Sequence, residues 1–121
     1  MFFVVAGVIN ILLALFHLSF WRDKDFNWRE ELPKMNPANR GLIQAAVILF
    51  IPILLSWGVI SFLLAGEPND DSLSRAVIVM MGTFYVIRGV IQPKLLGLDT
   101  SGAIIMLICL GLGTGYFAML L

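Results

Sequence analysis

Four long apolar runs occupy most of this chain, at residues 2–21, 41–65, 76–91 and 102–121. A helix needs about 20 mostly apolar residues to cross the hydrocarbon core of a bilayer. Three of the runs reach that length directly. The third reaches it as a helix over 72–92, which has Arg75 and Arg88 near its two ends. The pattern predicts an all-α membrane protein with four transmembrane helices.

Composition supports this class, because 60% of the residues are hydrophobic and only 13% are charged, against about 25% charged in ordinary soluble domains. Four helices use most of the 121 residues, so we predict a single domain over 1–121, an up-down-up-down four-helix bundle. The formal net charge of zero argues against nucleic acid as a partner. The expected partners are the lipid bilayer, other membrane subunits or a second copy of the chain.

The positive charges of the connections predict the topology. The first and third connections together hold seven Lys or Arg residues: Arg22, Lys24, Arg29, Lys34, Arg40, Arg88 and Lys94. The second holds only Arg75, beside Glu67, Asp70 and Asp71. This asymmetry places the first and third connections in the cytoplasm and both termini outside.

Capping residues predict where the helices begin. Asn36 before Pro37, the 70–72 acid-serine cluster and the 99–101 cluster fit the starts of the second, third and fourth helices. Gln92-Pro93 and Gly97 are expected to end the third helix. Pro52 is expected to kink the second, leaving a carbonyl near Ile48 without its amide partner.

The first connection predicts a short interfacial helix from Trp28 to about Leu32. Asn27 and Glu30 have the spacing of a capping box. Trp21, Phe26 and Trp28 suit the headgroup level of a membrane.

Small and polar residues recur along one face of the first helix at steps of three and four: Gly7, Asn10, Ala14, His17 and Trp21. Such stripes form helix–helix contacts in membranes, so this face is expected to point into the bundle. Gly111 and Gly115 of the last helix have the GxxxG spacing, which permits close approach within the chain or to a partner. Gly82 and Gly89 allow the same interpretation. Cys109 is expected to be a small buried hydrophobe.

Polar side chains gather at one end of three predicted spans. The candidate ligand-binding residues of this pocket are His17, Glu30, Glu31, Arg40, Gln44, Tyr85, Arg88 and Gln92. Each Arg–Gln pair is spaced i, i+4 and so shares a helix face. The acids Asp25, Glu30 and Glu31 are expected counter-charges for the two arginines. We expect the segment 25–31 to close the pocket.

Two interpretations of this cluster remain open. In one, the arginines reach to the membrane surface and interhelical hydrogen bonds hold the first connection against the bundle. In the other, the guanidinium groups bind a phosphate or carboxylate of a headgroup. His17 likewise fits a structural hydrogen bond, a ligand contact, proton transfer or a zinc site with Glu30 and Glu31.

The sequence contains no nucleophile motif, phosphate loop, cysteine pair or zinc-protease spacing. It therefore predicts no catalytic residue, no metal and no cofactor, and leaves open whether the chain is an enzyme. No acid lies inside a span, which argues against a proton-coupled exporter that needs an embedded carboxylate.

The pattern Phe16-His17, Phe20-Trp21, Phe26-Asn27-Trp28, Glu31-Leu32, Asn39-Arg40, Gln44 and later Arg88 with Gln92 resembles a group of small bacterial four-helix membrane proteins of unknown function. The resemblance covers mainly residues 16–44 and 85–92. It implies a four-span bundle in the bacterial inner membrane, and it implies no activity or substrate.

Two functions follow from these observations. The first is a small non-catalytic integral membrane protein that packs with lipid or serves as an accessory subunit of a larger complex. The alternative is a membrane-embedded binding protein or enzyme that acts on an amphiphile, a lipid headgroup or a quinone, at the cytoplasmic-side polar pocket.

Overall fold

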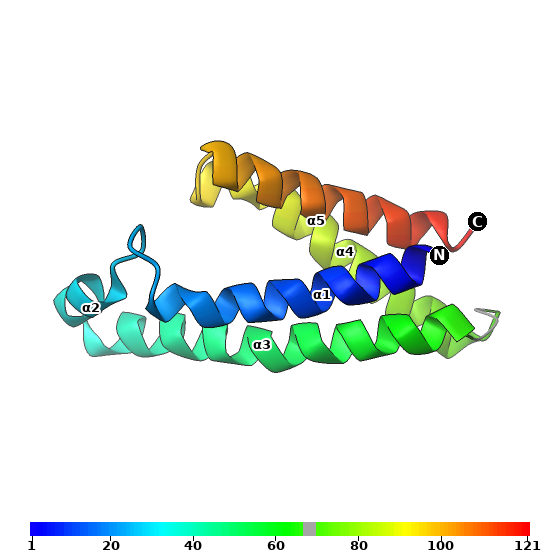
Figure 1. Ribbon diagram of the computed structural model, residues 1–121, viewed down its shortest axis with the longest axis horizontal. Coiled ribbons are helices and arrows are strands. Elements are labelled where there is room, and N and C mark those ends of the chain that lie inside the picture. The colour runs from blue at the N-terminus through cyan, green and yellow to red at the C-terminus, as the bar shows by residue number, and fades with distance from the viewer. Residues whose placement is uncertain (67–69) are drawn as a thin grey trace. The chain divides into compact units, whose positions relative to one another are not determined.

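In the computed structural model, the described residues, 1–66 and 70–121, form helices and turns and contain no strand. Glu67, counted above in the second connection, and Asn69 lie outside this described part. Figure 1 shows the four long helices, which are α1 (Phe2–Leu18), α3 (Pro37–Gly66), α4 (Ser72–Leu95) and α5 (Thr100–Ala118). Each, with α1 extended to Trp21, is long and apolar enough to cross a membrane. The all-helical prediction with four candidate spans is confirmed.

The chain divides into two compact units. Unit 1 comprises Met1 and Phe3–Ala65, and unit 2 comprises Phe2 and Gly66–Leu121. Each unit contains two of the long helices and the turns that belong to them. The prediction of one four-helix domain stays a prediction.

In unit 1, α1 and α3 approach each other at glycines. A Cβ on Gly58 would lie 2.9 Å from Cγ1 of Ile11 and 3.2 Å from the carbonyl oxygen of Gly7, and a Cβ on Gly7 would meet the ring of Phe62 at 2.8 Å. Further along, the rings of His17 and Phe50 lie 5.8 Å apart. Since rising numbers on α1 meet falling numbers on α3, the two helices run antiparallel.

The small-residue stripe of α1 is confirmed for its first three members. Gly7, Asn10 and Ala14 are buried, and His17 is half-buried. Trp21 is 39% exposed, which contradicts its expected place on the buried face. The α-helix ends at Leu18 and continues as a 3₁₀ turn, whose three residues per turn change the direction of later side chains.

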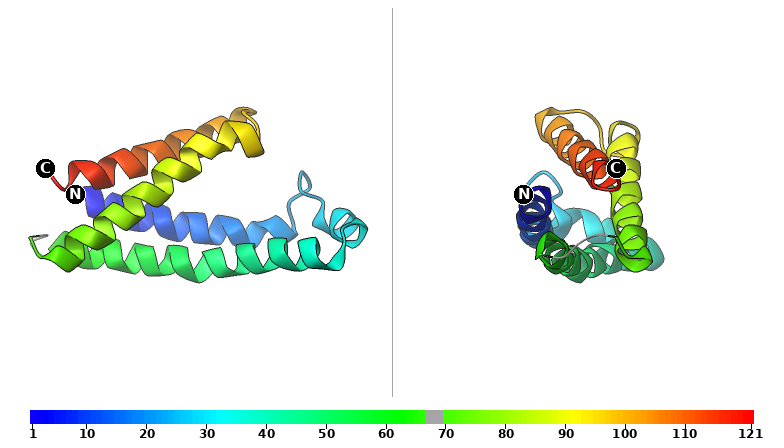
Figure 2. Two further views of the ribbon diagram at one scale, coloured as in Figure 1. Left: turned by 180° about the vertical axis from the view of Figure 1, so that it is seen from behind. Right: turned by 90° about the vertical axis from the view of Figure 1, so that its right-hand side faces the viewer.

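In unit 2, α4 packs against α5 over the part of α4 that leads to the turn between them, and Figure 2 shows the two helices side by side there. A Cβ on Gly89 would lie 2.7 Å from the Leu110 side chain, and a Cβ on Gly113 would lie 2.7 Å from Val86 Cγ2 and 3.1 Å from the Gly82 carbonyl oxygen. At these points only glycine leaves room for the neighbouring helix. Gly82 and Gly89 therefore have the close-packing role that the sequence indicated.

The two glycines of the GxxxG motif do not both lie at the contact between α4 and α5, as their spacing would allow. Gly111 is exposed, and a Cβ on it would meet no atom within 4 Å, whereas Gly113, between the two motif glycines, is buried against α4. The side of a helix that meets a neighbour depends on its rotation about its axis. The spacing of two glycines does not determine that rotation.

All three predicted helix starts are confirmed. The Asn36 side chain accepts from the Asn39 amide at 2.9 Å, and α3 begins at Pro37. Asp71 accepts from the amides of Leu73 and Ser74, and Asp99 accepts from that of Gly102. Hydrogen bonds from the Ser74 hydroxyl and amide lower the pKa of the exposed Asp71 carboxyl below its usual 3.8, because they stabilise its charged form.

Of the residues predicted to end α4, Gln92-Pro93 is wrong, since the helix continues through Pro93 to Leu95, and Gly97 is confirmed, since it follows the C-cap residue Leu96. A proline in the last turn removes only one amide donor, and the Leu96 amide still donates to the Gln92 carbonyl at 3.0 Å. The turn then passes through Gly97, whose φ of +83° favours glycine. Pro52 lies inside the continuous helix α3, and the kink there stays a prediction.

Candidate functional site

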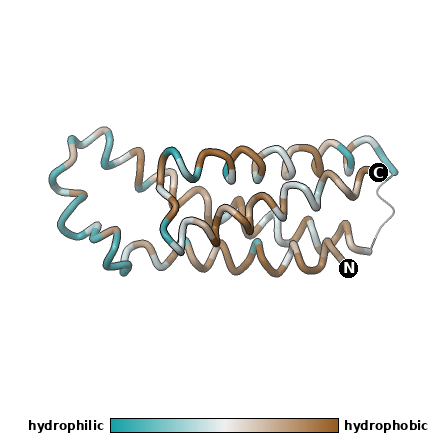
Figure 3. The backbone as a smooth tube through the Cα atoms, turned by 90° about the horizontal axis from the view of Figure 1, so that it is seen from above, coloured by the Kyte–Doolittle hydropathy of each residue, from teal (hydrophilic) through white to brown (hydrophobic). Residues whose placement is uncertain are grey.

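The five candidate residues of unit 1 lie in the first connection, which joins α1 to α3, or in the helix turns next to it. Figure 3 shows hydrophilic colours gathered there. His17 lies in the last turn of α1. Its Nδ1 is 2.7 Å from the Leu13 carbonyl oxygen, which can only accept, so Nδ1 carries the proton. This hydrogen bond and the rings of Phe20 and Phe50, at 4.9 and 5.8 Å, fix the orientation of the imidazole.

An aromatic cluster connects the end of α1 to α2 (Trp28–Glu31). The Phe20 ring lies 4.7 Å from that of Phe26 and 6.1 Å from that of Trp28, and the Trp21 and Trp28 rings are 5.2 Å apart at 81°. Edge-to-face contacts of this kind add to the area that aromatic rings bury. The predicted short helix is confirmed, followed by a 3₁₀ turn over Leu32–Lys34, and the cluster holds it beside α1.

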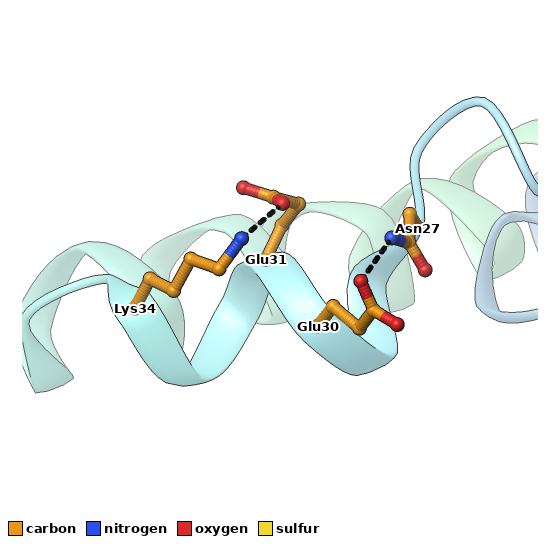
Figure 4. Close-up of polar contacts among 4 residues, drawn as sticks. All are labelled: Asn27, Glu30, Glu31 and Lys34. Atoms are coloured by element: carbon orange, nitrogen blue, oxygen red, sulfur yellow. Dashed lines mark hydrogen bonds and ion pairs between the residues drawn. The ribbon is translucent and has the colours of Figure 1, made fainter.

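Glu30 and Glu31 point to partners within the first connection (Figure 4). The Asn27 side-chain amide donates to Glu30 Oε2 at 2.9 Å, and Lys34 Nζ pairs with Glu31 Oε1 at 2.6 Å. The predicted capping box is wrong, because Asn27 has a left-handed backbone, φ 44°, and its side chain accepts no helix amide. Asn27 instead acts as a donor to the acid three residues on.

Arg40 and Gln44 lie one turn apart near the start of α3, and both are half-buried. Within the described part of unit 1, the structure shows no ion pair between Arg40 and a carboxylate. The expected pairing of Arg40 with the acids of the first connection is therefore wrong. Glu31 pairs with the nearer cation, Lys34, which lies three residues away on the same turn.

The three candidate residues of unit 2 occupy one side of α4. Tyr85 is buried, and its ring stacks on that of Tyr116 at 6.2 Å and 10°. Half-buried Arg88 donates from Nη1 to Gln92 Oε1 at 2.5 Å. Gln92 is only 3% exposed, and its Nε2 donates to the Gly97 carbonyl oxygen at 3.4 Å.

The turn between α4 and α5 completes this polar group. A Cβ on Gly102 would lie 2.6 Å from the Gly97 carbonyl oxygen, 2.9 Å from Asp99 Oδ1 and 3.0 Å from Gln92 Nε2. The hydrogen-bonded chain Arg88–Gln92–Gly97 and the Asp99–Gly102 cap thus lie side by side at this turn, and we call the two together the hairpin network. Asp99 was predicted only as part of a helix start and Gly102 only as the first residue of the last apolar run, because their closeness to Gln92 arises from the turn that Gly97 permits.

The eight candidate residues consequently form two sets. In unit 1, the His17 ring lies 4.9 Å from the Phe20 ring of the aromatic cluster, while Glu30 and Glu31 bind within the first connection. In unit 2, Arg88 and Gln92 are hydrogen-bonded to each other, as their spacing predicted. A common pocket of both sets stays a prediction.

Metal binding and cysteine chemistry have no clear site in the described residues. In residues 1–66 and 70–121, no group of three or more His, Cys, Asp or Glu side chains is arranged to hold a metal ion. Cys109 is buried at 3% exposure, which confirms its interpretation as a small buried hydrophobe.

Comparison with known proteins yields no relative: no family model matches the chain, and neither the curated proteins nor the solved structures give a match. Function must therefore be inferred from the geometry of the chain itself.

Proposed function

We propose that this chain is a small integral membrane protein, non-catalytic, whose four helices cross the bilayer up-down-up-down and pack against lipid or the subunits of a larger membrane complex. The observation that carries the proposal is the exposed apolar surface of all four long helices. Soluble monomers rarely expose contiguous apolar patches above a few hundred Å².

The amount of exposed apolar side chain is large in both units. Within the most apolar 18-residue stretch of each span, only 28% of the residues of α1, α3 and α5 and 33% of those of α4 are buried. Leu12, Leu49 and Leu107 are 58%, 60% and 65% exposed. Such side chains are stable in hydrocarbon and costly in water, at about 25 cal/mol per Å².

The first connection fits the boundary between lipid and water. Its aromatic cluster has apolar rings beside exposed cations, including Arg22 and Lys24, a combination typical of the headgroup region. An interfacial position would explain why a short helix of four residues forms in a connection that only needs to join two spans.

Membrane extraction tests the proposal directly. We expect the full chain, expressed in bacteria, to stay in the membrane pellet after washing with alkaline carbonate and to be released by mild detergent. A peripheral protein would be released by carbonate. Recovery of the folded chain from the carbonate supernatant would contradict the proposal. For a chain that stays in the pellet, the mass of the detergent-released particle distinguishes a lone chain from a subunit of a complex.

The topology of this proposal places both termini outside and the first and third connections in the cytoplasm. A membrane-impermeant thiol reagent applied to intact spheroplasts should therefore label Asn69→Cys and leave Ser101→Cys unlabelled until the membrane is permeabilised. Native Cys109 is buried and gives the background. Labelling of Ser101→Cys without Asn69→Cys would reverse the orientation.

The alternative function, binding or conversion of an amphiphile at a polar pocket, has one observation in its favour. Arg88 and Gln92 form a hydrogen-bonded pair on an apolar helix. Polar groups at membrane depth are energetically costly, and those that are present usually have a function.

A further inference from the structure

We propose that Arg88, held in place by Gln92, binds the phosphate of an anionic lipid headgroup in the leaflet next to the α4–α5 turn. This inference rests on the proposed membrane location and adds a specific ligand class to it. Unlike the predicted common pocket, the site needs only residues of unit 2.

Gln92 fixes the direction of the guanidinium group. Both ends of its buried amide are engaged, because Oε1 accepts from Arg88 at 2.5 Å and Nε2 donates to the Gly97 carbonyl oxygen at 3.4 Å. An amide used at both ends has a defined orientation, and so does the arginine bonded to it. A site in which the charged group is already oriented binds its ligand at lower entropic cost.

Within the described part of unit 2, no ion pair joins Arg88 to a carboxylate. Asp99 accepts from the Gly102 amide at 2.7 Å, and Asp71 caps the opposite end of α4. The hydrogen bond to Gln92 uses one of the five N–H donors of the guanidinium and adds no negative charge. A half-buried cation in an apolar span gains most from an anion that supplies this missing charge.

The position of the guanidinium along α4 matches the headgroup level. Since Arg88 extends to Gln92, one turn nearer the end of the helix, its charge lies three residues before Leu95, or about 5 Å at 1.5 Å per residue. Arginines reach toward the interface in this way. The remaining N–H groups can bind two oxygens of a phosphate at once, which lysine cannot do.

The test measures lipid binding by the purified full chain in mild detergent. Unfolding midpoints are recorded while dioleoyl phosphatidylglycerol, dioleoyl phosphatidylcholine or inorganic phosphate is titrated in, and apparent dissociation constants follow from the shifts. We expect phosphatidylglycerol to stabilise the chain most, since phosphatidylcholine carries its own cation. Arg88→Gln should weaken phosphatidylglycerol binding at least about tenfold, the effect of losing one charge-assisted hydrogen bond.

Two matched variants sharpen the result. Lys94→Gln removes an exposed cation from the same helix and should bind phosphatidylglycerol as the unaltered chain does. Gln92→Glu places a carboxylate beside Arg88, so it should supply the missing charge from within and weaken phosphatidylglycerol binding about tenfold. Because a carboxylate cannot donate to the Gly97 carbonyl oxygen, its midpoint in lipid-free detergent is expected to fall, and the readout is the further shift that phosphatidylglycerol causes. Gln92→Glu tests the proposal even where Arg88→Gln fails to fold.

Several outcomes would overturn the site. These are unchanged binding in Arg88→Gln or Gln92→Glu, an equal loss in Lys94→Gln, and equal stabilisation by inorganic phosphate, which would assign a free anion. A chain that resists carbonate extraction but shows no phosphatidylglycerol preference loses only this site. A chain released by carbonate loses the membrane proposal itself.

Discussion

Gly113→Ala is expected to lower the free energy of unfolding by about 1–3 kcal/mol, the usual cost of inserting a methyl group into a closely packed contact. The new Cβ would lie 2.7 Å from Val86 Cγ2, 2.9 Å from the Val86 backbone nitrogen and 3.1 Å from the Gly82 carbonyl oxygen. Two of these three atoms belong to the backbone of α4 and cannot rotate away. The helices must then separate.

Gly111→Ala is the matched control, two residues away on the same helix. Its Cβ would meet no atom within 4 Å, so the substitution should raise the free energy of unfolding by about 0.5–1 kcal/mol through the higher helix propensity of alanine. The two variants should thus change stability in opposite directions. Reversible unfolding in mixed detergent micelles, followed by circular dichroism, measures both.

Destabilisation by Gly111→Ala together with tolerance of Gly113→Ala would contradict this packing of α4 on α5. It would instead indicate that the GxxxG face, Gly111 with Gly115, forms the close contact. The same unfolding measurement, made under conditions in which the chain self-associates, would show whether that face contacts a second copy of the chain.

Gly102→Ala is expected to have the second large effect, a loss of about 2–4 kcal/mol in the free energy of unfolding, from overpacking together with the loss of a cap. The Cβ would lie 2.6 Å from the Gly97 carbonyl oxygen, 2.9 Å from Asp99 Oδ1 and 3.0 Å from Gln92 Nε2. It would therefore disturb the cap of α5 and the buried amide at once, which adds about 1 kcal/mol for the cap to the cost of overpacking.

A double-mutant cycle with Asp99→Ala separates these two contributions. Asp99→Ala alone removes the 2.7 Å hydrogen bond to the Gly102 amide and should cost about 1 kcal/mol. Because Gly102→Ala already disrupts this cap, the two losses should fall short of additive by up to that amount. Gly41→Ala, at an open position of α3, is the glycine control.

Strict additivity of Gly102→Ala and Asp99→Ala would contradict a shared network. So would a neutral Gly102→Ala, because its Cβ would lie 2.6 Å from the Gly97 carbonyl oxygen, a backbone atom that cannot rotate away as a side chain can.

Much of the secondary structure could be predicted because its causes are local in the sequence. Asn36, Asp71 and Asp99 cap helices by bonding amides two or three residues on, and the i, i+4 spacing of Arg88 and Gln92 is enough to bring them into contact. The predicted helix end at Pro93 was wrong. A proline in the last turn removes one backbone hydrogen bond, and the free energy lost with it is smaller than the stabilisation from the hydrogen bonds of the preceding turns.

The candidate site was predicted only in part. The sequence indicated which polar residues lie near span ends. It did not indicate which of them pair, because several oppositely charged side chains lie within reach of each other. Glu31 pairs with Lys34 rather than Arg40, since a spacing of three residues on one turn brings their charges together without ordering any other segment. The sequence indicated that Trp21, Phe26 and Trp28 belong together at the membrane surface, but the geometry of the aromatic cluster depends on the turn after Leu18.

By itself, the sequence determined the all-helical class, the four candidate spans and the helix starts, because apolar length and capping hydrogen bonds act within a few residues. Only the tertiary structure decided that Gly113, and not Gly111, faces α4, and that Gly102 of α5 lies beside the Gln92 amide of α4. Those contacts depend on how each helix is rotated about its axis and on which atoms of the neighbouring helix lie opposite, and residue spacing along one helix contains neither quantity.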